Sequence, residues 1–129
     1  MIGKAIVSLL NASDDLLALV ASANIYPYVI NEDTALPAIV YTIDSLAPEY
    51  TKDGWIGDEC VFSIVSFSDS FTSLQNIAME VRKSLELESG VNAGITTERI
   101  YLTGQSEGYN ISENVFLNRL TFSTIITGY

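Results

Sequence analysis

The sequence predicts an α+β fold in the order ααβββαββ: a mainly antiparallel β-sheet, one long amphipathic helix packed on it, and an N-terminal helical hairpin. Apolar residues near the N-terminus recur at helical spacing, and a long apolar stripe in steps of three and four lies in the second half. In most of the remaining chain, apolar and polar residues alternate or apolar residues are continuous, and both patterns are typical of β-strands. With 129 residues, 48% of them hydrophobic, and no repeat or linker, the chain is expected to form one domain over residues 1–129.

The first predicted element is the helical hairpin. Its first helix carries apolar residues three and four positions apart, and Ser13 then offers an N-cap to a second, shorter helix, because its hydroxyl can accept from a free backbone N–H. The apolar positions are Ile2, Ile6, Leu9 and Leu10 in the first helix, and Leu16, Leu17 and Val20 in the second.

Strand patterns begin after Asn24. The segment Ile25 to Ile30 is a short strand interrupted by Pro27, and Pro37 precedes a longer strand, Ala38 to Leu46, in which two kinds of side chain alternate. Proline suits the start of a strand because its ring presets φ and it has no N–H to donate. The longer strand is expected to turn one face toward the core and a wetter face outward.

A polar segment, Pro48 to Asp58, follows this strand. It contains Asp53-Gly54, a pair that favours tight hairpin turns, and is therefore predicted to be a protruding hairpin tip between two antiparallel strands. Within it lie three large side chains, Tyr50, Trp55 and Ile56.

The next strand, Cys60 to Phe67, is apolar on both faces through most of its length, which predicts a central strand covered on both sides. Cys60 is the only cysteine, so no intrachain disulfide exists. Its apolar neighbours predict a buried side chain that behaves as a small hydrophobe.

The long helix is predicted to begin at Ser70, to pack across the sheet, and to end with Gly90 as its C′ residue. Two strands follow, Ile95 to Gln105 and Val115 to Thr127, joined by a turn from Gly108 to Asn114. The helical stripe comprises Phe71, Leu74, Ile77, Ala78, Val81 and Leu85. One side of the last strand carries Phe116, Leu120, Phe122 and Ile126, with Asn118 and Thr124 interrupting it.

Charge and composition argue against several functions. Sixteen Asp and Glu against six Lys and Arg give a net charge of -10, a field that repels phosphates and disfavours non-specific nucleic-acid binding. The chain has no histidine, which excludes a His-based triad, a His-containing zinc site and an imidazole base. No apolar run approaches the length of a membrane helix, and the N-terminal one lacks a convincing cleavage site. We expect a protein made in the cytosol, without membrane contact.

Carboxylates are the remaining candidates for chemistry. They occur in adjacent or near-adjacent pairs, for which we favour a solvated surface, because a glycosidase needs two carboxyls at a fixed separation across a cleft. Residues 53–59 offer oxygen ligands without EF-hand spacing, and the glycines form no phosphate-binding loop. We therefore expect no catalytic residue, metal, cofactor or enzymatic activity. The pairs are Asp14 with Asp15, Asp58 with Glu59, and Glu86 with Glu88.

The order and spacing of several motifs resemble the tail-completion family of tailed bacteriophages, also called tail terminators or tail-to-head joining proteins. The likeness covers nearly the whole chain. Its motifs are the early helices, Ile25-Tyr26-Pro27, the run Leu36-Pro37-Ala38-Ile39-Val40-Tyr41, the turn near Asp53-Gly54, and a strand leading into the helix from Phe71, which contains Val81-Arg82-Lys83-Ser84-Leu85.

The resemblance implies a mechanical function. Several copies would form a ring, expected to be hexameric, at the head-proximal end of the tail tube, where they would stop polymerisation and join the tail to the head connector or stopper. The chain would work in the virion tail or neck, after assembly in the host cytoplasm. DNA would pass through the lumen without specific binding, which a carboxylate-lined wall favours. A related neck protein or minor tail subunit would carry much of the same pattern.

The interface residues of such a ring are predicted in the hairpin tip: Tyr50, Lys52, Asp53, Trp55 and Ile56. In the alternative interpretation, Trp55 and Ile56 fold back as a satellite cluster. Two other functions stay open. One is a monomeric small-molecule-binding or enzymatic α+β domain with an enclosed pocket, and the other is an adaptor that binds one protein through this tip.

Overall fold

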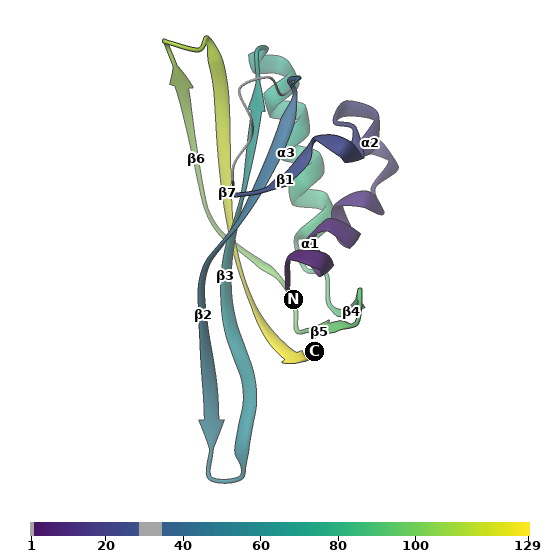
Figure 1. The fold of residues 1–129 in the computed structure, drawn as a ribbon, viewed down its shortest axis with the longest axis vertical. Coiled ribbons are helices and arrows are strands. Elements are labelled where there is room, and N and C mark those ends of the chain that lie inside the picture. The colour runs from purple at the N-terminus through teal and green to yellow at the C-terminus, as the bar shows by residue number, and fades with distance from the viewer. Residues whose placement is uncertain (1, 29–34) are drawn as a thin grey trace.

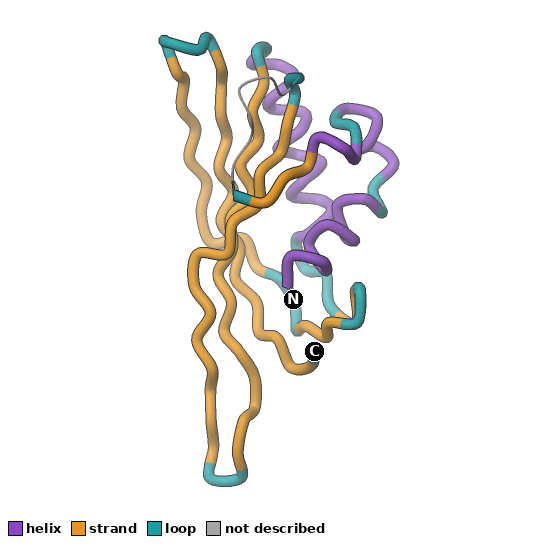
Figure 2. The backbone as a smooth tube through the Cα atoms, viewed as in Figure 1, coloured by secondary structure: helices purple, strands orange, loops and turns teal. Residues whose placement is uncertain are grey.

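Helices and strands separate into two layers in the computed structural model, which describes residues 2–28 and 35–129 (Figures 1 and 2). The helices lie against one face of a twisted sheet, and two hairpins extend the sheet at opposite ends. The elements are α1 (Ile2–Asn11), α2 (Asp14–Leu19), η1 (Ser22–Asn24), β1 (Ile25–Pro27), β2 (Ala38–Thr51), β3 (Gly54–Ser68), α3 (Phe71–Leu85), β4 (Gly90–Asn92), β5 (Ile95–Thr97), β6 (Tyr101–Asn110) and β7 (Val115–Gly128).

The described residues form a sheet of seven strands in the order β1-β2-β3-β7-β5-β4, and β6 pairs with β7 off this path. All pairs are antiparallel except β1 with β2. On the side away from β3, β7 pairs with β6 over its first part and with β5 near its end. The predicted α+β class, with N-terminal helices and a helix packed on a mainly antiparallel sheet, is confirmed.

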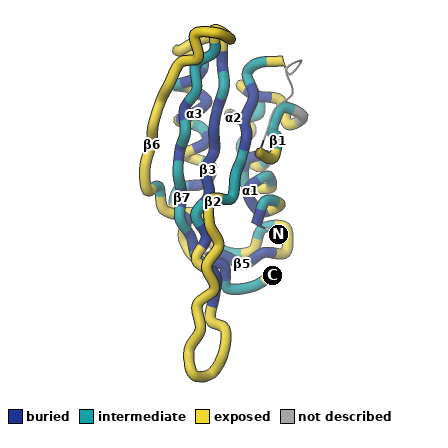
Figure 3. Tube along the Cα trace, turned by 60° about the vertical axis from the view of Figure 1, so that its left-hand side comes forward, coloured by how far each residue is buried: buried dark blue, intermediate teal, exposed yellow. Residues whose placement is uncertain are grey.

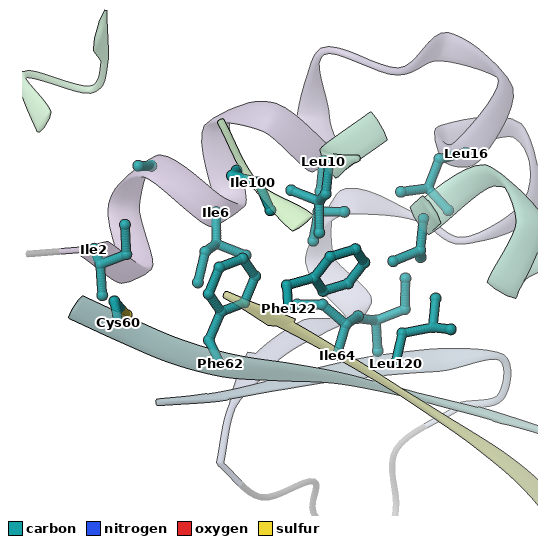
Figure 4. Close-up of a cluster of buried hydrophobic side chains, with 14 of the residues drawn as sticks. Ile2, Ile6, Leu10, Leu16, Cys60, Phe62, Ile64, Ile100, Leu120 and Phe122 are labelled. Carbon is teal, nitrogen blue, oxygen red and sulfur yellow. The ribbon is translucent and has the colours of Figure 1, made fainter. Parts of the chain in front are cut away.

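The hydrophobic core lies between the helices and the facing side of the sheet (Figure 4). Phe62 of β3 and Phe122 of β7 are cross-strand partners, and their stacked rings have centroids 5.5 Å apart. Ile6 and Leu10 of α1 cover these rings. Cys60 is fully buried beside them, and that burial, followed by the charges of two nearby carboxylates, raises the pKa of its thiol to about 11. The prediction of a buried cysteine is confirmed.

The predicted N-cap at Ser13 and the predicted helix start at Ser70 are both present. The Ser13 hydroxyl accepts from the Leu16 backbone N–H at 3.2 Å, and the Ser70 hydroxyl accepts from that of Ser73 at 3.4 Å, so each begins its helix as expected. The stripe of α3 is buried as predicted except for Phe71, which is half exposed and packs edge-on against Phe116. Its buried members are Leu74, Ile77, Ala78, Val81 and Leu85.

The predicted helix stop at Gly90 is wrong. The helix ends at Leu85, and Leu87 takes the left-handed conformation, with φ of 64°. The Leu87 N–H donates to the Ile100 carbonyl at 2.7 Å, and the Ile100 N–H donates to Glu88. These long-range bonds hold the chain in an extended path after the helix, so Gly90 lies in a strand, β4, which the sequence patterns did not predict.

The predicted strand from Ile95 to Gln105 is two strands. Ile100 is buried in the core between β5 and β6, and the flanking residue Glu98 is held by β7: its N–H donates to Ile125 and its carbonyl accepts from Thr124. The chain therefore turns inward at Ile100 rather than running straight. The next turn is also shorter than expected, because β6 continues to Asn110.

The first strand is also shorter than predicted, since β1 covers only Ile25–Pro27. Residues 29 and 30 of the predicted strand, and most of the loop after it, lie outside the described residues.

Strand β3 is central, as predicted, but the described helices cover only one of its faces (Figure 3). On the other face Ser63 is nevertheless fully buried, because the neighbouring strands fold polar side chains over it. Its hydroxyl donates to Asp44 of β2, whose carboxylate also binds Arg119 of β7 at 3.1 Å. Cross-strand polar contacts therefore replace the second layer that its apolar pattern suggested.

Candidate assembly surface

The strands β2 and β3 extend far beyond the rest of the sheet (Figures 1 and 3). Strand β1 pairs with β2 only as far as Tyr41, and β7 reaches β3 only from Asp58 onward, while β2 and β3 remain paired to Thr51 and Gly54. Every residue from 44 to 56 is exposed. We call this segment, residues 44–56, the hairpin arm.

The arm has the protrusion expected of residues 48–58, but strand rather than loop forms it. Only Lys52 and Asp53 lie between the two strands. The Thr51 hydroxyl accepts from the Asp53 N–H at 3.3 Å, and Gly54 has a φ of 118°, a conformation that side chains disfavour. The tight turn is therefore centred on Lys52 and Asp53, one residue earlier than the Asp53-Gly54 pair that the sequence indicated, and Gly54 is the first residue of β3.

One side of the arm is tied to the end of β7 through Asp58. The Trp55 Nε1–H donates to Asp58 Oδ1 at 2.9 Å, the Tyr129 hydroxyl donates to Oδ2, and the two aromatic rings lie 6.3 Å apart. Asp58 is only 8% exposed. Burial of the phenol and its bond to Asp58 raise the pKa of Tyr129 to about 12. The expectation that Asp58 belongs to a solvated carboxylate pair is therefore wrong.

This contact makes a spectroscopic prediction, because Trp55 is the only tryptophan. Asp58→Asn leaves one acceptor oxygen for two donors, so we expect red-shifted Trp55 emission and a loss of about 1–3 kcal/mol in the free energy of unfolding. Fluorescence and urea denaturation measure both effects. The matched control is Asp53→Asn at the exposed turn, which should change neither. Unchanged emission in Asp58→Asn would mean that the contact does not hold the indole.

The five predicted interface residues all lie on the arm. Tyr50 and Ile56 are 70% and 50% exposed, so they remain available to a partner. Trp55 is 42% exposed and folds back partly onto Tyr129, as the alternative interpretation expected for it. Lys52 and Asp53 are exposed at the turn. A role of these five in binding stays a prediction.

Sequence reasoning missed Asp58 and Tyr129 as the residues that position the arm. They are separated by 71 positions, and Tyr129 follows the last strand as an isolated aromatic residue. Only the register of β3 with β7, which pairs Asp58 with Ile126, shows that they meet.

The other carboxylate pairs lie on the surface, where Asp15 and Glu88 border the same open groove beside α3. Asp14 and Asp15 are exposed in the first turn of α2, where carboxylates stabilise the helix dipole. Arg82 binds Glu86 at 2.6 Å, and this hydrogen bond lowers the pKa of the Glu86 carboxyl. Within residues 2–28 and 35–129, no three His, Cys, Asp or Glu side chains group closely enough to hold a metal ion.

Open grooves border α3. One lies between α3 and β6 and has a volume of about 300 Å³. Two others, of about 410 and 300 Å³, lie where α3 meets α2 and α1. None of the helices in the described part of the chain is long and apolar enough to cross a membrane.

The fold and this surface define a class: a small α+β structural domain that carries an exposed two-stranded arm. The particular family follows from sequence. The profile of the family described as tail completion protein gp17 matches residues 4–127. The chain therefore belongs to the tail completion protein family and is a structural protein of phage-type tails, as the motifs of its sequence indicated.

A solved structure has the same fold. It is a chain from the virion of a native gene transfer agent particle, with a TM-score of 0.82 and 20% sequence identity, and the match covers 96% of this chain and 92% of that one. No curated protein matches this sequence.

Proposed function

We propose that copies of this chain form a hexameric ring at the head-proximal end of a tail tube, stop its polymerisation and join it to the head connector or stopper. Membership of the tail completion family carries this proposal. The partners are then the tail tube protein, the connector and neighbouring copies, in the tail or neck of the virion, and the chain assembles there from the host cytoplasm.

The shape of the chain supports a ring. A cyclic assembly needs two unlike patches on each subunit, one of which contacts the other patch on the next copy. The hairpin arm supplies a projecting patch at one end of the sheet, with two large exposed side chains, Tyr50 and Ile56. In an isolated chain these side chains are in water, whereas an interface would bury them.

The charge of the chain suits the passage of DNA. A net charge of -10 leaves few cations to pair with phosphates, so DNA crosses the lumen of the proposed ring without specific binding. We further propose that the chain has no catalytic activity, in keeping with its lack of histidine and with the deeply buried Cys60.

The function is tested by a nonsense codon at Trp55 in the phage or prophage that encodes this chain. Electron microscopy of the lysate should show loose heads with unattached tails, many of them of irregular length, and suppression of the codon should restore joined particles. Complete infectious particles with tails of normal length would refute the proposal. They would favour instead a monomeric adaptor that binds one protein through the arm, or a small-molecule-binding domain.

A further inference from the structure

A groove beside α3 is the best candidate for the surface that receives the arm. Its volume is about 300 Å³, room for a large side chain rather than a single water molecule. Met79, which is 58% exposed, lies at its rim, and the buried residues Ala78 and Leu120 form apolar parts of its wall. Gln75, Arg82 and Gln105 supply polar groups around this apolar centre.

The strand that borders this groove, β6, has an edge whose main protection is one bulge, between Leu102 and Gly104. Among the described residues it pairs only with β7, and its other edge is exposed along almost the whole strand (Figure 3). Edge strands usually carry lysine, proline or outward charges that prevent pairing with other chains. The ten residues of β6 include no lysine, arginine or proline, and its one charged residue is Glu107.

Glu107 does not protect the edge. Its Oε1 accepts from the Gln75 side chain of α3 at 2.7 Å and from the Asn118 side chain of β7 at 3.2 Å. The carboxylate is thus turned onto its own chain. The backbone N–H and C=O groups that β6 directs outward are therefore available to an added strand, as in β-augmentation.

The free edge of β2 differs from that of β6. It contains Pro48, which has no N–H, and the acidic residues Asp44 and Glu49. Register shifts between Ile43 and Ser45, and again between Glu49 and Tyr50, interrupt its pairing with β3, whereas β6 has one shift, between Leu102 and Gly104, in its pairing with β7. The arm therefore carries the usual protection on its β2 edge, and its exposed side chains, rather than that edge, are its contact surface.

Charge and position favour a second copy of the chain as the occupant of the groove. The arm has three carboxylates, Asp44, Glu49 and Asp53, the first already bound to Arg119, against one lysine. The groove is bordered by two cations, Arg82 and Lys83, and by one carboxylate, Glu86. Arg82 already pairs with Glu86, and Lys83 with Glu80 at 3.6 Å, but both cations are solvent-accessible, and such surface pairs exchange partners at little cost. Figure 1 shows the arm at the opposite end of the sheet from the β6–β7 turn, so an arm projects away from its own groove.

We propose that the hairpin arm of one copy lies in the α3–β6 groove of the next copy, with Ile56 and Tyr50 against Met79 and the arm alongside the free edge of β6. The contact presupposes the ring proposed above and names its two unlike patches. Because the arm of each copy binds the groove of the next, the contact is head-to-tail. Such contacts close into a ring when a whole number of subunit rotations makes one full turn.

Paired cysteines test this contact. In the double variant Ile56→Cys and Met79→Cys, oxidation should move most of the chain from the monomer to dimer and higher bands on a non-reducing gel, because a disulfide forms only when the two Cβ atoms approach to about 4 Å. The native Cys60 is buried and does not compete. The matched control pairs Ile56→Cys with Ile111→Cys, which is 84% exposed at the β6–β7 turn and outside the groove, and it should remain monomeric on the same gel.

A second measurement distinguishes the groove contact from the ring itself. The particle mass of the same samples is determined in solution, alone and in the presence of tail tubes. Ring-sized particles that give no Met79 cross-link would overturn the groove contact and leave the ring. A chain that stays monomeric even on tubes would overturn both. A cross-link from Ile56→Cys to the tube protein, in place of one between copies, would also overturn the groove contact and assign the arm to another partner.

Discussion

Replacing Tyr50 and Ile56 together with serine is expected to abolish assembly while leaving the fold intact. The two side chains are 70% and 50% exposed, so the isolated chain gains little from them and its free energy of unfolding should change by no more than about 0.5 kcal/mol. At an interface, each substitution removes buried apolar surface worth about 1.5 kcal/mol or more. The two substitutions together therefore weaken the affinity of each subunit contact about 100-fold. Mass measurement of the assembled particles and the plaque titre after complementation of the Trp55 nonsense phage measure the effect.

The control for this variant is another exposed apolar residue at the opposite end of the molecule. Ile111→Ser removes an isoleucine that is 84% exposed in the β6–β7 turn, and it should leave both the particle mass and the titre unchanged. Normal assembly by the Tyr50→Ser and Ile56→Ser double variant would remove the arm from the interface. An equal loss from Ile111→Ser would show that the far end of the sheet also binds.

Local signals predicted much of this fold from sequence. Ser13 and Ser70 begin helices because a hydroxyl satisfies backbone N–H groups within its own turn, and the stripe of α3 follows from helical periodicity alone. The errors fall where partners far away in sequence decide the backbone. The helix ends before Leu87, which takes the left-handed conformation while its N–H donates to the Ile100 carbonyl, and Gly90, which also has a positive φ of 106°, lies beyond it in β4.

The candidate surface was predictable to the same extent. The arm was visible as a polar segment with a turn pair and three large side chains, and all five predicted interface residues lie on it. The length of the arm could not be predicted, because two strands that pair only with each other need no continuous apolar face, and the sequence therefore has no pattern that marks where they end. The α3–β6 groove could not be predicted either, since Met79 and Gln105 meet only after β6 adds to β7.

Phe122→Ala is expected to have the largest effect on stability. Phe122 is fully buried and stacks on Phe62 at the centre of the core, so its truncation removes apolar contacts and leaves a cavity that the paired strands cannot close. We expect a loss of about 3–5 kcal/mol, a large fraction of the roughly 5–15 kcal/mol that holds a domain folded. Urea denaturation followed by circular dichroism measures it, because Trp55 lies on the arm and reports on the core only indirectly.

The half-exposed Phe71 is the control for the core variant. It packs on Phe116 near the start of β7, away from the centre of the core, so Phe71→Ala should cost about 1 kcal/mol or less. A loss below about 1.5 kcal/mol for Phe122→Ala would mean that the stacked pair is not the centre of the core.

Measuring assembly at several temperatures distinguishes the loss of stability in Phe122→Ala from the loss of the subunit contact in the Tyr50→Ser and Ile56→Ser variant. Phe122→Ala should regain assembly at a temperature where it is folded, whereas the Tyr50→Ser and Ile56→Ser variant, folded throughout, should remain unable to assemble, because it lacks the contact and not the fold.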